Sequence, residues 1–318
     1  MQAVFLDFGT VSTGDDLNIA PLLALLPNLK VHRVTADAQV DERIAGCEVV
    51  LSNKAEITRA RIEANPALKL VALTATGVNN VDLLAARERG VAVCNIRDYC
   101  TPSVVQHVFA TLLALTHSIR EYDQALKQGE WEKGEQFTLL NFPIRELTGR
   151  TMGIVGFGAL GQGVARVAEA FGMRVLVANR PGGAREAGRV DLDDLLPQVD
   201  VLSLHCPITE ATRNLIGARE LALMRPDAVL INTARGALID AVALAAALRS
   251  RQIGGASIDV LTQEPPVDGN PLLAADLHHL IVTPHTAWAA QESRQRAIDE
   301  LTANVNDWLV GGRRGRVV

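Results

Sequence analysis

The sequence is poor in aromatic residues, in cysteine and in unbroken apolar runs. Aromatic side chains make up 4% of the 318 residues. No run approaches the roughly 18 apolar residues that a membrane-spanning helix needs. The four cysteines, Cys47, Cys94, Cys100 and Cys206, show neither C-x-x-C spacing nor a Cys/His spacing typical of zinc sites. The sequence therefore predicts no membrane span and no metal site, and it favours reduced, buried thiols in a cytoplasmic protein.

An excess of positive charge is also missing. Lys and Arg together number 31 against 36 Asp and Glu, so the formal net charge is −5 and gives no basic footprint for nucleic acid. The short basic run Arg313–Arg316 is typical of a solvated end. The residues Met1–Asp7 contain no basic segment followed by an apolar core, so we expect no secretory leader. Neither a nucleic-acid partner nor a membrane partner is expected.

What the sequence does contain is a regular alternation of short apolar runs and longer amphipathic stretches. The length favours about two domains, and 48% hydrophobic content is ample for buried cores. Such alternation is typical of α/β proteins with parallel sheets. The predicted strands of the first series are Ala3–Leu6, Val31–Val34, Val49–Leu51, Leu70–Leu73 and Val91–Cys94. Those of the second series are Thr151–Val155, Arg174–Ala178, Val201–Leu204, Ala228–Asn232, Gly255–Asp259 and Leu280–Val282.

Helical periodicity marks several segments between and after these strands. The first predicted helix has Asp15 or Asp16 as its N-cap, and Pro102 favours a helix start just after it. The last predicted helix is amphipathic, and its periodicity does not decide which series of strands it packs on. The predicted helices outside the glycine-rich centre are Asp16–Leu26, Val81–Arg89, Ser103–Gln128 and Ala289–Val310.

The centre of the chain carries a glycine loop. The predicted strand Thr151–Val155 runs directly into Gly156–Gly161, with glycines at positions 156, 158 and 161, and a helix is predicted over Val164–Phe171. A strand, G-x-G-x-x-G and a helix in this order form the dinucleotide-binding fingerprint. The glycines allow a tight turn and a close approach of a pyrophosphate to the helix N-terminus. The residues predicted to bind the cofactor here are Gly156, Gly158, Ala159 and Leu160.

The next predicted strand ends in Asn179 and Arg180. Dinucleotide-binding folds usually place an acidic residue there, which binds the ribose hydroxyls of NAD. No carboxylate directly follows this strand in the sequence, so the usual repulsion of a 2′-phosphate is missing and Arg180 is available to pair with that phosphate. We expect NAD(P)H as the cofactor, with NADP(H) slightly favoured. Alternatively, Asn179 binds a plain ribose and Arg180 lies over the adenine or in solvent.

Three strand ends downstream of the loop carry residues suited to catalysis. Arg235, in Asn232–Gly236, has the planar guanidinium that binds a carboxylate through two hydrogen bonds. Glu264 lies in Asp259–Pro266, and His285 follows the last strand. A histidine with a carboxylate partner delivers a proton near neutral pH. Each residue alone is compatible with an ion pair or a surface loop, but the three together after a dinucleotide loop favour an active site.

With these residues in place, the chain resembles the D-isomer-specific 2-hydroxyacid dehydrogenases over essentially its whole length. The matching segments are Thr76–Asp82, Gly156–Gly161, His205–Thr209, Asn232–Gly236, Asp259–Pro265 and Pro284-His285. Within this family, Ser52–Lys54, Val105–His107 and His285–Trp288 look most like the glycerate dehydrogenases, also called hydroxypyruvate reductases. Gln106 stands where many members have Glu, and Asn179 stands where many have Asp. The second departure puts specificity for NAD in doubt.

The resemblance implies two Rossmann-like domains, each with a doubly wound parallel sheet. A discontinuous substrate domain would comprise residues 1–98 and 288–318. An inserted dinucleotide-binding domain would comprise residues 99–287. The long helix after Pro102 would then be a hinge and part of the surface of a homodimer.

The implied reaction interconverts a small 2-keto acid, such as hydroxypyruvate or glyoxylate, and its 2-hydroxy acid by hydride transfer at C2. The implied catalytic residues are Arg235, Glu264 and His285, with Glu264 fixing the tautomer of the histidine that moves the proton. Further implied cofactor contacts are His205, Cys206, Pro207, Thr209, Thr233, Ala234 and Asp259, together with Arg235 and His285. The implied substrate contacts are Lys54, Thr76, Gly77, Val78 and Trp288, together with Arg235 and His285.

Two alternatives stay open at this stage. The first is a reductase of another 2-keto acid, such as pyruvate, a bulkier keto acid or 3-phosphohydroxypyruvate. The second is a nucleotide-sensing binding protein similar to the corepressors that share this fold. The presence of all three residues, Arg235, Glu264 and His285, favours an enzyme over a pure sensor.

Overall fold

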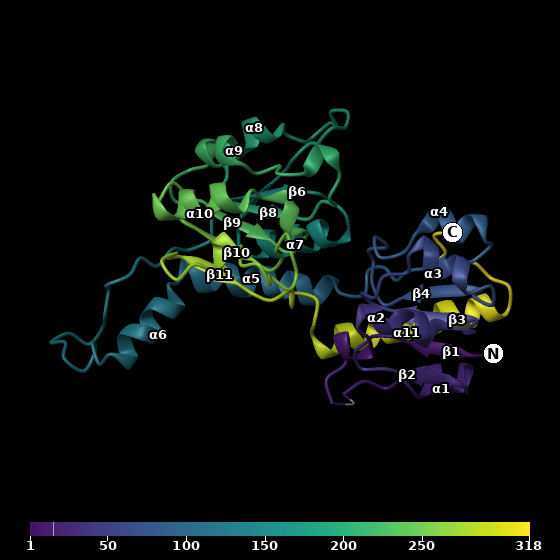
Figure 1. Ribbon diagram of the computed structural model, residues 1–318. Coiled ribbons are helices and arrows are strands. Elements are labelled where there is room, and N and C mark those ends of the chain that lie inside the picture. Colours follow the sequence, from purple (N-terminus) through teal and green to yellow (C-terminus); the bar gives the residue numbers. More distant parts are fainter. Residues whose placement is uncertain (15) are drawn as a thin grey trace. The chain divides into compact units, whose positions relative to one another are not determined.

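The computed structural model describes residues 1–14 and 16–318. The chain divides into two compact units, each with its own sheet (Figure 1). The first unit consists of Met1–Cys100 and Trp288–Val318, and the second unit consists of Thr101–Ala287. The second unit is therefore an insertion in the chain of the first.

The first unit is built on a five-stranded parallel sheet. Its strands are β1 (Ala3–Phe5), β2 (Leu29–Val31), β3 (Val49–Ser52), β4 (Leu70–Leu73) and β5 (Ala92–Cys94), in the order β2-β1-β3-β4-β5. Its helices are α1 (Ala20–Leu25), α2 (Asp37–Ile44), α3 (Arg59–Ala64), α4 (Leu83–Glu88) and α11 (Gln291–Leu309). Helices α1 and α11 pack on one face of the sheet, and α2, α3 and α4 pack on the other. Burial on both faces explains why β3 and β4 are continuous apolar runs.

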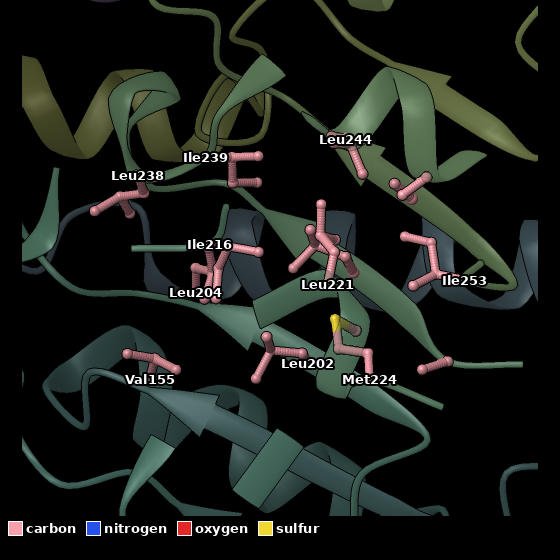
Figure 2. Packing of buried hydrophobic residues seen from close by; sticks show 14 of the residues in the cluster. Val155, Leu202, Leu204, Ile216, Leu221, Met224, Leu238, Ile239, Leu244 and Ile253 are labelled. Atoms are coloured by element: carbon pink, nitrogen blue, oxygen red, sulfur yellow. The ribbon is translucent and has the colours of Figure 1, made fainter. Parts of the chain in front are cut away.

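The second unit has a six-stranded parallel sheet. Its strands are β6 (Thr151–Val155), β7 (Arg174–Val177), β8 (Val201–Leu204), β9 (Val229–Asn232), β10 (Gly255–Ile258) and β11 (Leu280–Val282), in the order β11-β10-β9-β8-β6-β7. Its helices are α5 (Thr101–Thr116), α6 (Ile119–Lys127), α7 (Ala159–Ala170), α8 (Leu192–Leu195), α9 (Ala218–Leu223) and α10 (Ala241–Arg249). Helices α5 and α7 cover one face, and α8, α9 and α10 cover the other, where Figure 2 shows the packing of the core. The predicted α/β class with two Rossmann-like sheets is confirmed.

The two sheets share one strand order. In each unit the first strand lies between the second and the third, that is, β1 between β2 and β3, and β6 between β7 and β8. The direction of winding reverses between the first and third strands, and ligands of such sheets bind in the crevice beyond the carboxyl ends of the strands at that point. The topology therefore directs attention to the residues that follow β1, β3, β6 and β8.

Two predicted elements of the sequence were wrong in extent. The strand predicted over Val31–Val34 is β2, which ends at Val31; Val34 is 72% exposed, so its apolar side chain misled the pattern. The single helix predicted over Ser103–Gln128 is two helices, α5 and α6. The chain turns at Ser118, which has a φ of +50°, and the Ser118 hydroxyl donates to the Pro143 carbonyl oxygen.

The predicted starts of two helices were also wrong. Helix α1 begins at Ala20 after Ile19, because the Asp16 carboxylate is used earlier, by the Ser12 hydroxyl and the Thr13 amide. The alternative cap, Asp15, lies outside the described residues. Helix α7 begins at Ala159, several residues before the predicted start, so its N-terminus lies directly at the glycine loop. Within the described ranges, no helix combines the length and the apolar character needed to cross a membrane.

Candidate active site

The glycine loop follows β6 and is shaped by its lack of side chains. Gly156 has a φ of +93°, and a Cβ there would lie 2.6 Å from the backbone nitrogen of Cys206, which follows the neighbouring strand β8. A Cβ on Gly161 would overlap the carbonyl oxygen of Gly156. Gly158 is the N-cap of α7, and no atom lies within 4 Å of the place where its Cβ would be. Two glycines are therefore needed by the fold, while Gly158 keeps the helix N-terminus open to a ligand.

Two buried polar atoms near this loop have no partner. The Nε2 atom of His205 lies 2.9 Å from the Ser203 hydroxyl, but its Nδ1 atom and the hydroxyl of Thr233 are buried without a hydrogen bond in the described part of the chain. Burial lowers the pKa of His205 to about 4, so the ring is neutral at physiological pH. Buried polar atoms nearly always have a partner, and these two follow the adjacent strands β8 and β9. An open helix N-terminus beside unsatisfied polar atoms fits a dinucleotide.

The rest of the predicted cofactor segment after β8 is a compact turn. Cys206 is buried, which raises the pKa of its thiol to about 11, so it stays protonated. The Thr212 hydroxyl donates to the carbonyl oxygen of Pro207 at 2.8 Å and lies 3.1 Å from the Thr209 hydroxyl. These bonds order the backbone that faces Gly156.

The end of β7 contains a carboxylate that sequence analysis missed. The side-chain nitrogen of Asn179, Nδ2, donates to Asp191 Oδ1 at 2.6 Å, and the side-chain oxygen of Asn179, Oδ1, accepts from the backbone amide of Glu186 at 3.0 Å. Asp191 also forms an ion pair with Arg185, and Arg180 is exposed. Because Asp191 is 12 residues away from Asn179, no local spacing in the sequence indicated that it returns to this point.

Arg235 is presented by a tight turn after β9. The buried side chain of Asn232 accepts from the Ala234 amide at 3.0 Å and donates to the Arg235 carbonyl oxygen at 2.9 Å. The Arg235 guanidinium donates to the Ala234 carbonyl oxygen at 2.7 Å and is exposed. A side chain at Gly236 would overlap the backbone of Leu261, so this glycine lets the loop after β10 come close.

Glu264 and His285 form a pair. The His285 Nδ1 atom lies 2.6 Å from Glu264 Oε2, and Glu264 Oε1 accepts from the Leu261 amide at 2.8 Å. An ionised carboxylate only accepts hydrogen bonds, so Nδ1 carries the proton. Nε2 is then the ring nitrogen that takes up or releases a proton, and the loop bond to Leu261 fixes the direction of the carboxylate.

The predicted catalytic residues lie around one hollow of about 330 Å³ in the second unit. Arg235, Glu264 and His285 line it together, although they follow three different strands. Ile208 and Val260 contribute apolar wall, and Arg213 adds a second positive charge. A cationic hollow with a histidine–carboxylate pair at its edge suits a small anionic substrate that exchanges a proton.

Asp259 shapes the turn that carries His285. This carboxylate is 1% exposed, and it accepts hydrogen bonds from the Thr283 hydroxyl at 2.5 Å and from the amides of Thr286 and Ala287 at 2.8 and 2.9 Å. The carbonyl oxygen of Asp259 accepts from the His285 amide at 2.8 Å. His285 itself has a left-handed φ of +57°. Asp259 therefore orders the turn that carries His285, and its contact with the cofactor stays a prediction.

The predicted substrate residues outside this hollow belong to the first unit. Lys54 lies in the loop after β3, where the buried carboxylate of Asp7 accepts from three consecutive amides, those of Asn53, Lys54 and Ala55, at 2.8, 2.6 and 3.0 Å. Asp7 was not predicted as a functional residue, although an aspartate soon after the first strand is itself a signal. The role of the loop in substrate binding stays a prediction.

Two further predicted substrate positions are ordered by contacts within the first unit. The segment Thr76–Val78 follows β4, and the carbonyl oxygen of Thr76 accepts from the Asn95 amide group at 2.7 Å. The ring of Trp288 meets the ring of Tyr99 edge to face, with 6.2 Å between centroids. These contacts hold both positions in place, and their substrate roles stay predictions.

Known proteins are similar to this chain. The family model for the NAD binding domain of the D-isomer specific 2-hydroxyacid dehydrogenases matches residues 109–287. A glycerate dehydrogenase of Methylorubrum extorquens is 44% identical over 273 residues, covering 86% of this chain and 86% of that protein. A hydroxypyruvate reductase of Blautia hydrogenotrophica is 36% identical over 317 residues, covering 98% of each.

A solved structure has a similar fold over the full length of this chain. An acyclic imino acid reductase in complex with NADPH and D-Arg is 28% identical, covers 100% of both chains and superposes with a TM-score of 0.86. The family model and the two relatives agree with the resemblance that the motifs indicated, and the solved structure has the same fold. The chain belongs to the D-isomer specific 2-hydroxyacid dehydrogenase family.

Proposed function

We propose that this enzyme reduces hydroxypyruvate to D-glycerate, and glyoxylate to glycolate, with NAD(P)H. The observation that carries the proposal is the hollow lined by Arg235, Glu264 and His285, with the histidine and glutamate 2.6 Å apart. The relatives named glycerate dehydrogenase and hydroxypyruvate reductase support the choice of substrate.

The chain's own residues account for binding and for the proton. Arg235 binds the carboxylate of the keto acid and stabilises negative charge that develops on the carbonyl oxygen. Protonated His285 donates its Nε2 proton to that oxygen, while Glu264 holds the Nδ1 proton and so fixes the orientation of the ring. A bound reduced nicotinamide supplies the hydride to C2. In the reverse direction, neutral His285 accepts the hydroxyl proton at Nε2.

The remaining roles are part of the same proposal. The open start of α7 at Gly158, with Ala159 and Leu160, binds the pyrophosphate. The unsatisfied polar atoms of His205 and Thr233 meet polar groups of the cofactor. Lys54, Thr76, Gly77, Val78 and Trp288 complete recognition of the substrate. Exposed apolar side chains after α6, with Phe137 91% exposed and Leu140 78% exposed, support a homodimer.

A slight preference for NADPH over NADH is also proposed. Arg180 is exposed in the loop after β7, and the negative charge of Asp191, which accepts a hydrogen bond from the Asn179 side chain, is compensated by Arg185. The structural relative in complex with NADPH supports the same view. If this is correct, Arg180→Gln lowers kcat/KM with NADPH by about tenfold and leaves kcat/KM with NADH nearly unchanged, because only the 2′-phosphate loses its charged partner.

A substrate panel tests the function as a whole. Rates with hydroxypyruvate, glyoxylate, pyruvate, phenylpyruvate and 3-phosphohydroxypyruvate are measured with NADH and NADPH in parallel. We expect the highest kcat/KM for hydroxypyruvate, followed by glyoxylate. A higher value for one of the other keto acids would change the substrate but keep the reaction, whereas no turnover of any keto acid would contradict the proposal and favour nucleotide sensing.

A further inference from the structure

Helix α5 carries a buried serine, Ser103, and a half-buried histidine, His107, on one side of a mostly apolar helix. Ser103 and His107 are four residues apart, so they lie on the same face of the helix. The Ser103 hydroxyl donates to the carbonyl oxygen of Ala287 at 2.7 Å, and His107 Nε2 lies 3.1 Å from the Thr283 hydroxyl. The helix therefore holds both ends of the turn over residues 283–287, and this turn contains His285.

The direction of these hydrogen bonds follows from proton counting. The Thr283 hydroxyl has a single proton, and it donates this proton to the ionised carboxylate of Asp259 at 2.5 Å. Its oxygen must then accept from His107, so Nε2 of His107 carries a proton. The chain of donation runs from His107 through Thr283 to Asp259, and the same carboxylate accepts the amides of the turn.

We propose that His107 is a positioning residue for His285, acting through Thr283 and Asp259. The proposal rests on the proton-transfer role given to His285 above. A left-handed φ of +57° at a residue other than glycine is strained, so the turn at His285 keeps its shape only because neighbouring groups fix it. His107 fixes the hydroxyl that orients the Asp259 carboxylate. Among the described residues, His107 is not one of those lining the hollow, so it acts on the reaction only through the turn.

Variants of His107 test whether this residue positions His285. His107→Phe keeps a planar ring but removes the donor, and we expect kcat to fall about tenfold while the KM for hydroxypyruvate and the Kd for NADPH change less than twofold. His107→Gln, whose amide nitrogen can donate at a similar distance, is expected to recover most of kcat. His117→Gln, just beyond the end of α5, is the matched control and leaves kcat unchanged. An unchanged kcat in His107→Phe, or a failure of His107→Gln to recover it, overturns the proposal.

A double-variant cycle and a ligand-free measurement distinguish this proposal from the proposed function. In a His285→Ala background, His107→Phe is expected to cause no further loss of turnover, and a further tenfold loss would show that His107 acts elsewhere. Nitrogen-15 NMR of the histidine rings in the protein without ligands is expected to show His107 with its proton on Nε2. A proton on Nδ1 alone overturns the proposal, whereas full activity of His285→Ala overturns the proposed function and is recognised from that single variant.

Discussion

The two units have the same strand order, but they use the crevice at the reversal point in opposite ways. In the first unit, Asp7 follows β1 and its carboxylate accepts the amides of Asn53, Lys54 and Ala55, which follow β3. In the second unit, Gly156 follows β6 without a side chain and lies against the backbone that follows β8. One crevice therefore contains an anion supplied by the protein, and the other keeps an open helix N-terminus for an anion from outside.

The difference shows that topology provides the crevice but not its function. Backbone amides at the carboxyl ends of strands attract negative charge in either sheet. Where Asp7 already satisfies them, they order a loop and present Lys54; where Gly156 and Gly158 stand, they remain available to a phosphate. A few side chains at the strand ends thus separate a unit whose amides are already satisfied by a carboxylate of the protein from a unit whose helix N-terminus stays open to a nucleotide.

The largest expected effect comes from comparing the loss of the proposed proton donor in the second unit with the loss of a proposed substrate contact in the first unit. His285→Ala is expected to lower kcat by about 10²–10⁴, because a positioned acid is lost. Lys54→Met is expected to raise the KM for the keto acid by about tenfold with little change in kcat, as for the loss of one charge-assisted hydrogen bond. Steady-state kinetics with hydroxypyruvate and a fluorescence titration with NADPH measure both variants, and we expect an unchanged Kd for NADPH in each. A fall in kcat for Lys54→Met equal to that for His285→Ala would contradict the division of roles between the units.

Single substitutions test the two crevices separately. Asp7→Ala leaves the amides of Asn53 and Lys54 without their acceptor, whereas the Ala55 amide keeps its bond to the Ser52 hydroxyl. At a cost of about 1–3 kcal/mol for each group that stays unpaired, we expect the first unit to lose about 3 kcal/mol of stability. The KM for the keto acid should rise, and the Kd for NADPH should not.

Gly156→Ala forces an L-residue to a φ of +93° and brings a methyl group within 2.6 Å of the Cys206 nitrogen, so it should weaken NADPH binding and destabilise the second unit.

Gly158→Ala controls for the loss of stability that Gly156→Ala is expected to cause. Its added methyl group meets no atom within 4 Å, so thermal unfolding should remain close to that of the wild type. The Kd for NADPH should nevertheless rise by about tenfold, because the methyl group occupies the open side of the helix N-terminus. Unchanged NADPH binding in Gly158→Ala would show that the cofactor does not approach the loop from that side.

Burial decides how well the sequence predicted the fold. Strands such as β4, β6 and β8 were predicted at their observed bounds, because each is a short, fully buried run of mostly apolar residues covered by helices. The edge strand β2 has no fully buried residue, so its apolar pattern is weak and its position was wrong. Helix α2 was not predicted at all, because only Val40 and Ile44 are buried along its polar sequence.

The site was predictable where it depends on topology and unpredictable where it depends on packing. Arg235, Glu264 and His285 follow β9, β10 and β11, which are neighbours in a parallel sheet, so their strand ends meet at one edge. His107 is 176 residues from Thr283, and its bond depends on how α5 lies on the sheet. Nothing in the local sequence specifies that placement, although a histidine and a serine on one side of an apolar helix were a signal.

The last comparison concerns two histidines at strand ends, one in each unit. Desolvation lowers the pKa of His205, after β8, from 6.5 to about 4, and it also lowers the pKa of His32, after β2, with smaller contributions from Arg43 and Lys30. The unfolded chain binds a proton near pH 6.5 that folded His205 does not take up until about pH 4. Stability therefore falls as the pH decreases through this range, and it is fully retained above pH 6.5.

The size of this effect follows from the shift. Each pH unit between the two pKa values changes the stability by 1.36 kcal/mol, so His205 should remove about 2 kcal/mol from the second unit between pH 6.5 and pH 5. In His205→Gln this part of the pH dependence should disappear, whereas His32→Gln should change the slope much less. Native-state hydrogen exchange of the β8 and β9 amides measures the second unit alone, because it reports local opening. Equal slopes of stability against pH in the wild type and in His205→Gln would mean that the His205 ring is protonated in the folded state. That result would contradict a neutral, buried His205 beside the glycine loop.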